Sequence, residues 1–207
     1  MLKAYKYKIY PNKLQREFIE KHFGCCRLLY NLALEVKISA WKSVAQKNIS
    51  IYEIKKEVKL LRKEFDWMKE VNCDSQHLTL LNLDKAYVKF FKEKKGFPKY
   101  KSKRGQQSFQ LTKSGVNFNA KKLFIPKLEN GIKTIFHQKF KGTIKTTTIS
   151  RTPAGKYFVS ILVDNNLPLP EKKPILPQTA VGIDLGLNHF AILSNGTKID
   201  SPRFLRK

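Results

Sequence analysis

The spacing of apolar residues changes twice along this chain, and these changes constrain its fold more than any other feature. Between Ala4 and Tyr10, apolar and lysine side chains alternate, as in a strand with one buried face. From Asn12 to about residue 95, apolar residues recur at helical spacing. Alternation then returns over residues 106–164. The pattern predicts an α+β chain in which a helical bundle is inserted into a barrel-like β domain.

The helical segment is expected to contain four helices. Gly24 is predicted to mark the break between the first and the second, and the third helix begins near Ile51. The fourth is expected to begin near Asp74 or Ser75, which are suitable N-caps. The side chains that it is predicted to bury are those of Leu78, Leu81, Leu83, Tyr87 and Phe91.

The β region contains one strong hairpin signal. The runs "TIKTTTISRT" and "KYFVSILV" are joined by Pro153, Ala154 and Gly155, and such a turn between β-branched runs favours a hairpin. The N-terminal strand is expected to join this region. After it, four prolines between Leu167 and Thr179 predict an extended linker. Beyond the linker, two strands are expected to meet near Gly186, with Asn195 and Gly196 turning into a third.

The charge of the chain points to a polyanionic partner. Its 41 Lys and Arg residues against 16 Asp and Glu residues give a formal net charge of +25, and so large an excess repels itself unless it is neutralised. Nucleic acid is the leading candidate, and an acidic membrane surface is the alternative. No apolar run approaches the ~20 residues of a spanning helix, and the N-terminal residues lack the apolar core of a signal peptide. We therefore expect no membrane partner and a cytoplasmic location.

The three cysteines do not have the spacing of a metal site. Cys25 and Cys26 are adjacent and Cys73 is distant, whereas tetrahedral zinc requires paired C-x-x-C spacing. We expect thiols and no zinc, with Cys25 and Cys26 packed at a junction between two helices.

The segment "GIDLG" places Asp184 at the end of an apolar strand and beside a glycine turn. A carboxylate so placed is suited to hold a divalent cation against a phosphate. The motif also resembles the first phosphate loop of actin-like ATPases, and a strand aspartate before a turn often only caps that turn. Because Leu187 and Asn188 follow where the ATPases have hydroxyl residues, a ribonuclease H-like strand is the better interpretation. In such a fold two metal ions bound by several carboxylates drive phosphodiester cleavage.

Six blocks in register resemble the N-terminal half of TnpB, a family of transposon-encoded RNA-guided DNA endonucleases related to the type V CRISPR effectors. They are "AYKYKIYPNKLQ", "FGCCRLLYNLALE", "LNLDKAYVKFF", "GFPKYKSKRGQQSF", "GTIKTTTISRTPAGKYFVSILV" and "VGIDLGLNHFAILSNG". The resemblance implies a wedge-like β-barrel with an inserted helical recognition bundle, followed by the first strands of a RuvC (ribonuclease H-like) domain. The expected segments are 1–11 with 105–166 for the wedge domain, 12–104 for the recognition domain, 167–179 for the linker and 180–207 for the start of RuvC.

The resemblance also implies that Asp184 is the first of three RuvC carboxylates. The later Glu, the C-x-x-C zinc ribbon and the final Asp of the family have no counterpart here, and Asp200 is the only other acid after the linker. One carboxylate cannot build a two-metal site. Mg²⁺ is therefore expected only with a complete RuvC site, to which a second chain would contribute.

Two groups of residues are predicted to bind nucleic acid. The first is expected to contact phosphates of a guide RNA, although solubility and a solvated hairpin tip are the alternatives: Lys99, Lys101, Lys103, Arg104, Arg151 and Lys156. Tyr100 lies between Lys99 and Lys101, and Phe97 lies just before them; these rings either stack on bases or pack internally. The second group lines up with positions that read a short DNA motif in the family: Tyr52, Lys56, Asp74, His77 and Thr112. Asp74 as a helix cap and His77 as an ordinary half-buried residue remain alternatives.

Three functions are compatible with these features. The leading one is a TnpB-type protein that binds guide RNA and double-stranded target DNA, with metal-dependent cleavage only if the rest of RuvC is supplied. The second is a naturally short, nuclease-inactive RNA-guided DNA-binding protein that acts as a repressor. The third is a decayed reading frame or a trimmed chain.

Overall fold

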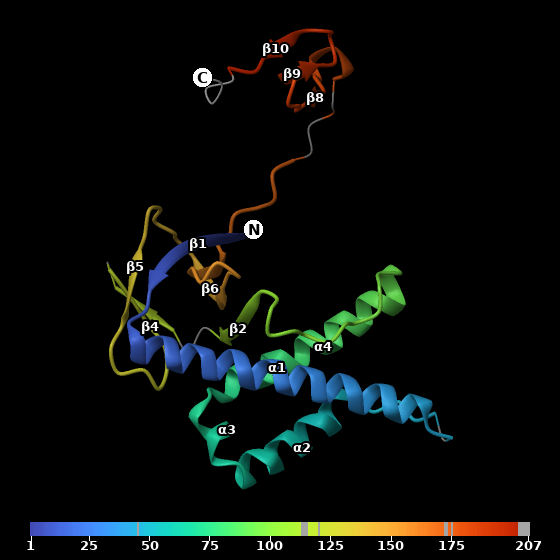
Figure 1. Cartoon of the computed structure of the whole chain (residues 1–207), viewed down its shortest axis with the longest axis vertical. Coiled ribbons are helices and arrows are strands. Elements are labelled where there is room, and N and C mark those ends of the chain that lie inside the picture. The colour runs from blue at the N-terminus through green and yellow to red at the C-terminus, as the bar shows by residue number, and fades with distance from the viewer. Residues whose placement is uncertain (45, 113–115, 120, 172–173, 175, 203–207) are drawn as a thin grey trace. The chain divides into compact units, whose positions relative to one another are not determined.

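The computed structural model of the protein describes residues 1–44, 46–112, 116–119, 121–171, 174 and 176–202. The chain divides into two compact units, Met1–Leu167 and Pro168–Lys207. The first contains a large sheet and the long helices, and the second contains a small sheet (Figure 1). The four segments predicted from the sequence divide the chain more finely than these units, and their boundaries stay predictions.

Seven antiparallel strands of the first unit form one curled sheet, ordered β2-β6-β7-β1-β5-β4-β3. The N-terminal strand lies inside it between β7 and β5, which confirms that it joins the β region. Over the described residues β2 and β3 are the two edges, so the sheet is an open half-barrel. The strands are β1 (Leu2–Tyr10), β2 (Gln107–Thr112), β3 (Asn117–Phe118), β4 (Lys122–Phe124), β5 (Ile132–Ile135), β6 (Thr143–Arg151) and β7 (Tyr157–Asp164).

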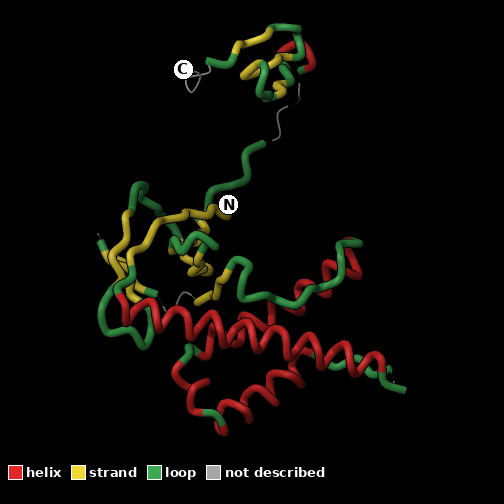
Figure 2. The backbone as a smooth tube through the Cα atoms, in the orientation of Figure 1, coloured by secondary structure: helices red, strands yellow, loops and turns green. Residues whose placement is uncertain are grey.

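Alternation along the strands buries one face of this sheet. In β1 the side chains of Tyr7 and Ile9 are buried, and in β7 Val159 and Ile161 are buried. The predicted hairpin of β6 and β7 is confirmed, with Gly155 at a φ of +74° in its turn. Figure 2 shows the strands gathered at the N-terminal part of the first helix, which contributes buried side chains to the same core.

The helices lie between β1 and β2: α1 (Lys13–Lys42), α2 (Ile51–Glu64), α3 (Asp66–Glu70) and α4 (Cys73–Glu93). Capping boxes fix the starts of α1 and α2, where Asn12 pairs with Gln15 and Ser50 with Glu53. The buried faces of α1, α2 and α4 form a second core. The prediction that Phe91 is buried is wrong, because its side chain is 73% exposed.

The predicted break at Gly24 is also wrong, since α1 runs unbroken from Lys13 to Lys42. Phe23 packs in the sheet core and Cys25 in the helical core, so both neighbours of Gly24 hold the helix in place. Burying one large apolar side chain contributes about 1.5–3 kcal/mol, whereas a glycine in a helix interior costs about 1 kcal/mol. Burial therefore outweighs the local preference.

The two adjacent cysteines consequently lie inside one helix, and they pack at the junction between α1 and α4. Both are buried against α4, where the Cys26 thiol lies 3.6 Å from the Ser75 carbonyl and Gln76 Nε2 lies 3.5 Å from Cys25 Sγ. Burial raises the pKa of Cys25 to about 11 and that of Cys26 to about 12. These side chains pack as neutral thiols.

Because a Cβ at Gly24 would meet no atom within 4 Å, Gly24→Ala is expected to stabilise the protein. The gain in the free energy of unfolding should be about 0.5–1 kcal/mol, measured by urea denaturation. Gly142→Ala is the matched control and should destabilise, because Gly142 has a φ of +124° and its Cβ would lie 2.3 Å from the Asp164 carbonyl oxygen. A loss of stability in Gly24→Ala would mean that this face of α1 is covered in solution.

The second unit contains a short 3₁₀ helix and three strands. They are η2 (Pro177–Thr179), β8 (Ile183–Asp184), β9 (His189–Leu193) and β10 (Lys198–Asp200). The strands pair antiparallel in the order β10-β9-β8, with Gly196 in the turn between β9 and β10. The three expected strands are confirmed, and their assignment to a RuvC domain stays a prediction. In the described part of the chain, no helix is both long and apolar enough to cross a membrane.

Candidate nucleic-acid interface

The segment between α4 and β2, residues 94–106, forms a basic loop that is fastened to the protein by its backbone. The buried Gln107 directs its Nε2 at the carbonyl oxygens of Ser102 and Gly105, both at 2.8 Å. Arg27 of α1 donates to Gln107 Oε1 at 2.7 Å. Asn31 of α1 exchanges hydrogen bonds of 2.8 and 3.0 Å with the Lys101 backbone. These hydrogen bonds hold the backbone of the loop and leave most of its cationic side chains exposed.

The four predicted cations of this loop are not equivalent. The ammonium of Lys101 lies 4.1 Å from the centre of the Tyr30 ring, and desolvation there lowers its pKa even though much of the side chain is exposed. Lys99, Lys103 and Arg104 are exposed, and no acid in the described residues forms an ion pair with them. These three are the cations free to meet a phosphate.

The aromatic residues of the loop have internal partners. The Tyr100 hydroxyl donates to Glu35 of α1, which raises the pKa of Tyr100. The Phe97 ring packs edge-on against Tyr87 and Phe90 of α4, with centroids 5.6 and 5.3 Å apart. Packing is therefore observed for Phe97, which remains 44% exposed.

The two cations flanking the β6–β7 turn also differ. Arg151 forms a 2.9 Å ion pair with Glu20 of α1, whose same oxygen accepts a 2.9 Å hydrogen bond from the Tyr157 hydroxyl. Arg151 therefore ties the hairpin to α1. Lys156 is exposed at the turn. Of these two residues, Lys156 therefore has the side chain that is freer to make the predicted contact with RNA.

A basic groove of about 590 Å³ lies between α2 and α4. It is lined by the cations Lys55, Lys56, Lys59, Arg62, Lys63 and Lys69, together with His77, and by no acid among the described lining residues. Arg62 is tethered by a 3.0 Å hydrogen bond to Gln76 Oε1, and Lys69 pairs with Asp66. The remaining lysines leave the groove strongly positive, which suits a phosphate backbone.

The motif-reading residues predicted from the resemblance fall into two neighbouring sets. Lys56 and His77 line the basic groove, and Tyr52 lies one turn before Lys56 on α2, 69% exposed. Desolvation, and to a lesser degree Lys55, lower the pKa of His77, which Asp74 opposes. His77 is thus held toward its neutral form at the wall of the groove.

Asp74 and Thr112 form the second set. Asn72, not Asp74, caps α4, because its side chain accepts the Asp74 amide at 3.1 Å. The Asp74 carboxylate instead accepts a hydrogen bond from the Thr112 hydroxyl at the end of β2. The alternative in which Asp74 serves only as the cap is therefore wrong. The pair joins the start of α4 to the edge of the sheet.

Asp184 ends β8 in the second unit and is exposed. Its strand is at the edge of the three-stranded sheet, and Asp184 pairs with Ile192 of β9. His189 Nδ1 lies 2.9 Å from Asp200 Oδ1 on the neighbouring strand. Within the described ranges no three His, Cys, Asp or Glu side chains are grouped to hold a metal. Mg²⁺ binding at a complete RuvC site stays a prediction.

Sequence reasoning missed Gln107, Asn31 and Arg27, which hold the basic loop, and no local pattern marks them. It also missed Lys59 and Lys63. Lys59 follows Lys56 by three residues and Lys63 follows Lys59 by four, so the spacing places the three lysines on one face of α2, and that signal was available.

A family profile described as a helix-turn-helix domain, HTH_OrfB_IS605, matches residues 1–47. In this range the structure describes one strand, β1, and one continuous helix, α1. The matched region thus supplies the middle strand of the sheet and the helix that packs against it and anchors the basic loop.

Three curated proteins are similar to the chain. "Putative RNA-guided DNA endonuclease" of Streptomyces pristinaespiralis is 32% identical over 99% of this chain and 51% of its own length. "Putative RNA-guided DNA endonuclease InsQ" of Escherichia coli (strain K12) is 26% identical over 100% of this chain and 50% of its own length. "Virulence protein VsdF" of Salmonella dublin is 31% identical over 51% of this chain and 98% of its own length. The chain spans about half the length of the first two.

Proposed function

Because the chain belongs to the TnpB family, we propose that it binds a guide RNA and a double-stranded target DNA as the recognition part of an RNA-guided endonuclease. The observation that carries this proposal is the arrangement of two cationic surfaces on one unit. The basic loop presents Lys99, Lys103 and Arg104, and the basic groove separately presents Lys56, Lys59 and Lys63. The first is assigned to RNA and the second to the DNA duplex.

The assignment of the groove to DNA rests on its position and chemistry. Four of its lysines, Lys55, Lys56, Lys59 and Lys63, lie along one helix, α2, where they can contact successive phosphates of a backbone. At its wall and beside it, His77, Tyr52 and the Asp74–Thr112 pair offer donors, acceptors and a ring that can read base edges. Backbone contacts there would position the duplex, and these polar groups would read the motif.

Cleavage is proposed only for an assembly that supplies further carboxylates. Asp184 would hold one side of a divalent cation in such a site, and the metal would activate water for phosphodiester hydrolysis. A second chain completing RuvC is the proposed source. The proposed location is the cytoplasm, where guide RNA and target DNA would meet.

The alternative function is RNA-guided occupancy of DNA without cutting. The same two cationic surfaces would serve this function, because binding RNA and DNA needs no metal site. Guided cleavage by an assembly that supplies further carboxylates would favour the endonuclease. Guided binding without cleavage in such an assembly would favour the repressor.

The proposal is tested by sequencing the RNA that copurifies with the chain and assaying the duplex that matches its guide segment. We expect a defined RNA species, and binding of the labelled duplex only in its presence. Lys59→Ala with Lys63→Ala should weaken duplex binding about tenfold while leaving RNA binding unchanged. Lys139→Ala with Lys141→Ala, two exposed lysines outside the groove, is the control. Purified chain free of RNA, and duplex binding that ignores RNA, would contradict the proposal.

A further inference from the structure

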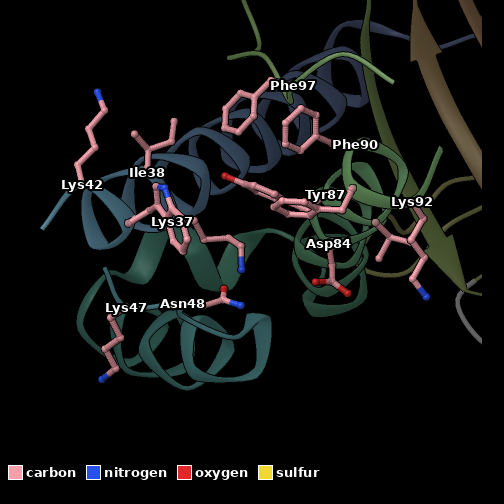
Figure 3. Close-up of a pocket in the computed structure, with 13 residues that line it drawn as sticks. Lys37, Ile38, Lys42, Lys47, Asn48, Asp84, Tyr87, Phe90, Lys92 and Phe97 are labelled. Carbon is pink, nitrogen blue, oxygen red and sulfur yellow. The ribbon is translucent and has the colours of Figure 1, made fainter. Parts of the chain in front are cut away.

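An aromatic groove of about 720 Å³ lies between the C-terminal parts of α1 and α4. Trp41 comes from α1, Tyr87, Phe90 and Phe91 come from α4, and Phe97 comes from the basic loop. Figure 3 shows the Phe90 and Phe97 rings beside each other, with Tyr87 next to them. The wall is therefore built from ring faces and edges, not from aliphatic side chains alone.

Two of these rings are far more exposed than packing requires. Trp41 is 62% exposed and Phe91 is 73% exposed. Phe91 has one face toward Tyr87, with centroids 6.3 Å apart and planes inclined by 21°. Tyr87 itself carries the ammonium of Lys37 over its ring at 5.2 Å. Trp41 and Phe91 are thus lining rings of the groove that remain largely exposed to solvent.

The rim of the groove is cationic. Lys42, Lys47 and Lys92 line it and extend outward from it in Figure 3, whereas Asp84 is the one acid among the described lining residues. A hydrophobic protein helix would cover the rings but would leave these lysines without partners unless it were acidic. A nucleotide chain satisfies both features, because its bases stack on rings and its phosphates meet lysines.

The strand that occupies the groove must be unpaired, because bases in a duplex are already stacked on one another. The groove is also continuous with the basic loop, since Phe97 precedes Lys99 by two residues in the same segment. From these observations we infer that the aromatic groove receives unpaired bases of the guide RNA. This inference rests on the proposed function and adds to it a subsite for a single-stranded part of the RNA.

The experiment uses the whole chain with Trp67→Phe, which leaves Trp41 as the only tryptophan of the two in the sequence. The probe is an oligouridylate of eight nucleotides, followed by Trp41 fluorescence and, when labelled, by anisotropy. Stacking of a base should quench Trp41. Adding Phe91→Leu should weaken binding about tenfold, the effect of losing one base–ring stack. Phe65→Leu, which removes another exposed ring, should change neither signal.

Each result bears on the two proposals differently. In one outcome, anisotropy reports binding while Trp41 is not quenched and Phe91→Leu does not weaken the binding. In that case the groove inference fails and the RNA-binding function stands. The groove would then be left to a protein partner. If oligothymidylate quenches Trp41 more strongly than oligouridylate, the assignment to RNA is overturned in favour of DNA. If neither oligonucleotide binds at low salt, both proposals fail.

Discussion

Replacing Lys99, Lys103 and Arg104 by alanine together is expected to weaken binding of the copurified RNA about a hundredfold at 0.1 M salt. Each phosphate that a cation neutralises adds about 0.7–0.9 to the slope of the logarithm of affinity against the logarithm of salt concentration. Three lost contacts should therefore make the slope shallower by about two to three. The affinity for labelled RNA is measured at salt concentrations from 0.05 to 1 M. The slope and the affinity at 0.1 M salt are then compared between the variant and the wild type.

Lys101 is kept in this variant because its ammonium lies over the Tyr30 ring. Its replacement would disturb the contact between the loop and α1, so a loss of affinity could come from either cause. The matched control replaces three exposed lysines outside the loop, Lys121, Lys139 and Lys141. Equal effects in both triple variants would show that the net charge of the protein, not the basic loop, attracts the RNA.

The sequence predicted those elements whose signals are local. Alternation in residues 4–10 and the helical stripe after Ile51 each lie within one element, the turn at Gly155 lies between two adjacent strands, and the structure confirms all three. The prediction of a helix break at Gly24 was wrong. The cost of about 1 kcal/mol for a glycine in a helix is outweighed by burial of the side chains on both sides, which the local pattern does not contain.

The candidate site was predicted by residue type but not by contact. The basic loop was recognised from its lysines, yet only the structure separates Lys101, packed on Tyr30, from the three cations that face solvent. Arg151 likewise pairs with Glu20, 131 positions away in the chain. Such partners are set by the tertiary fold, and a single sequence carries no local signal for them.

One buried side chain connects the stability of the fold to the start of α4, where Asp74 and His77 lie. His22 of α1 is 1% exposed, its Nδ1 lies 2.9 Å from the Phe18 carbonyl, and its Nε2 lies 3.0 Å from the Asn72 amide. Because the backbone N–H of Asn72 can only donate, His22 Nε2 must accept the hydrogen bond and Nδ1 must carry the proton. The ring is therefore neutral and holds the residue that caps α4.

Acidification is expected to destabilise the protein through this ring. Burial lowers the pKa of His22 from 6.5 to about 4, with the Phe18 carbonyl opposing the shift and Lys127 adding to it. Between these two values the unfolded chain binds a proton that the folded chain excludes. The free energy of unfolding is then highest above pH 6.5 and falls as the pH drops through this window, by about 2 kcal/mol at pH 5.

The substitution His22→Gln isolates this effect from other titrating groups. A glutamine can accept from the Asn72 amide and donate to the Phe18 carbonyl, and it does not titrate. Urea denaturation at pH 7.5, 6 and 5 should show a difference between wild type and variant that shrinks by about 2 kcal/mol toward pH 5. Parallel pH profiles would mean that His22 is protonated without penalty in the folded chain, and that the start of α4 does not depend on a neutral ring.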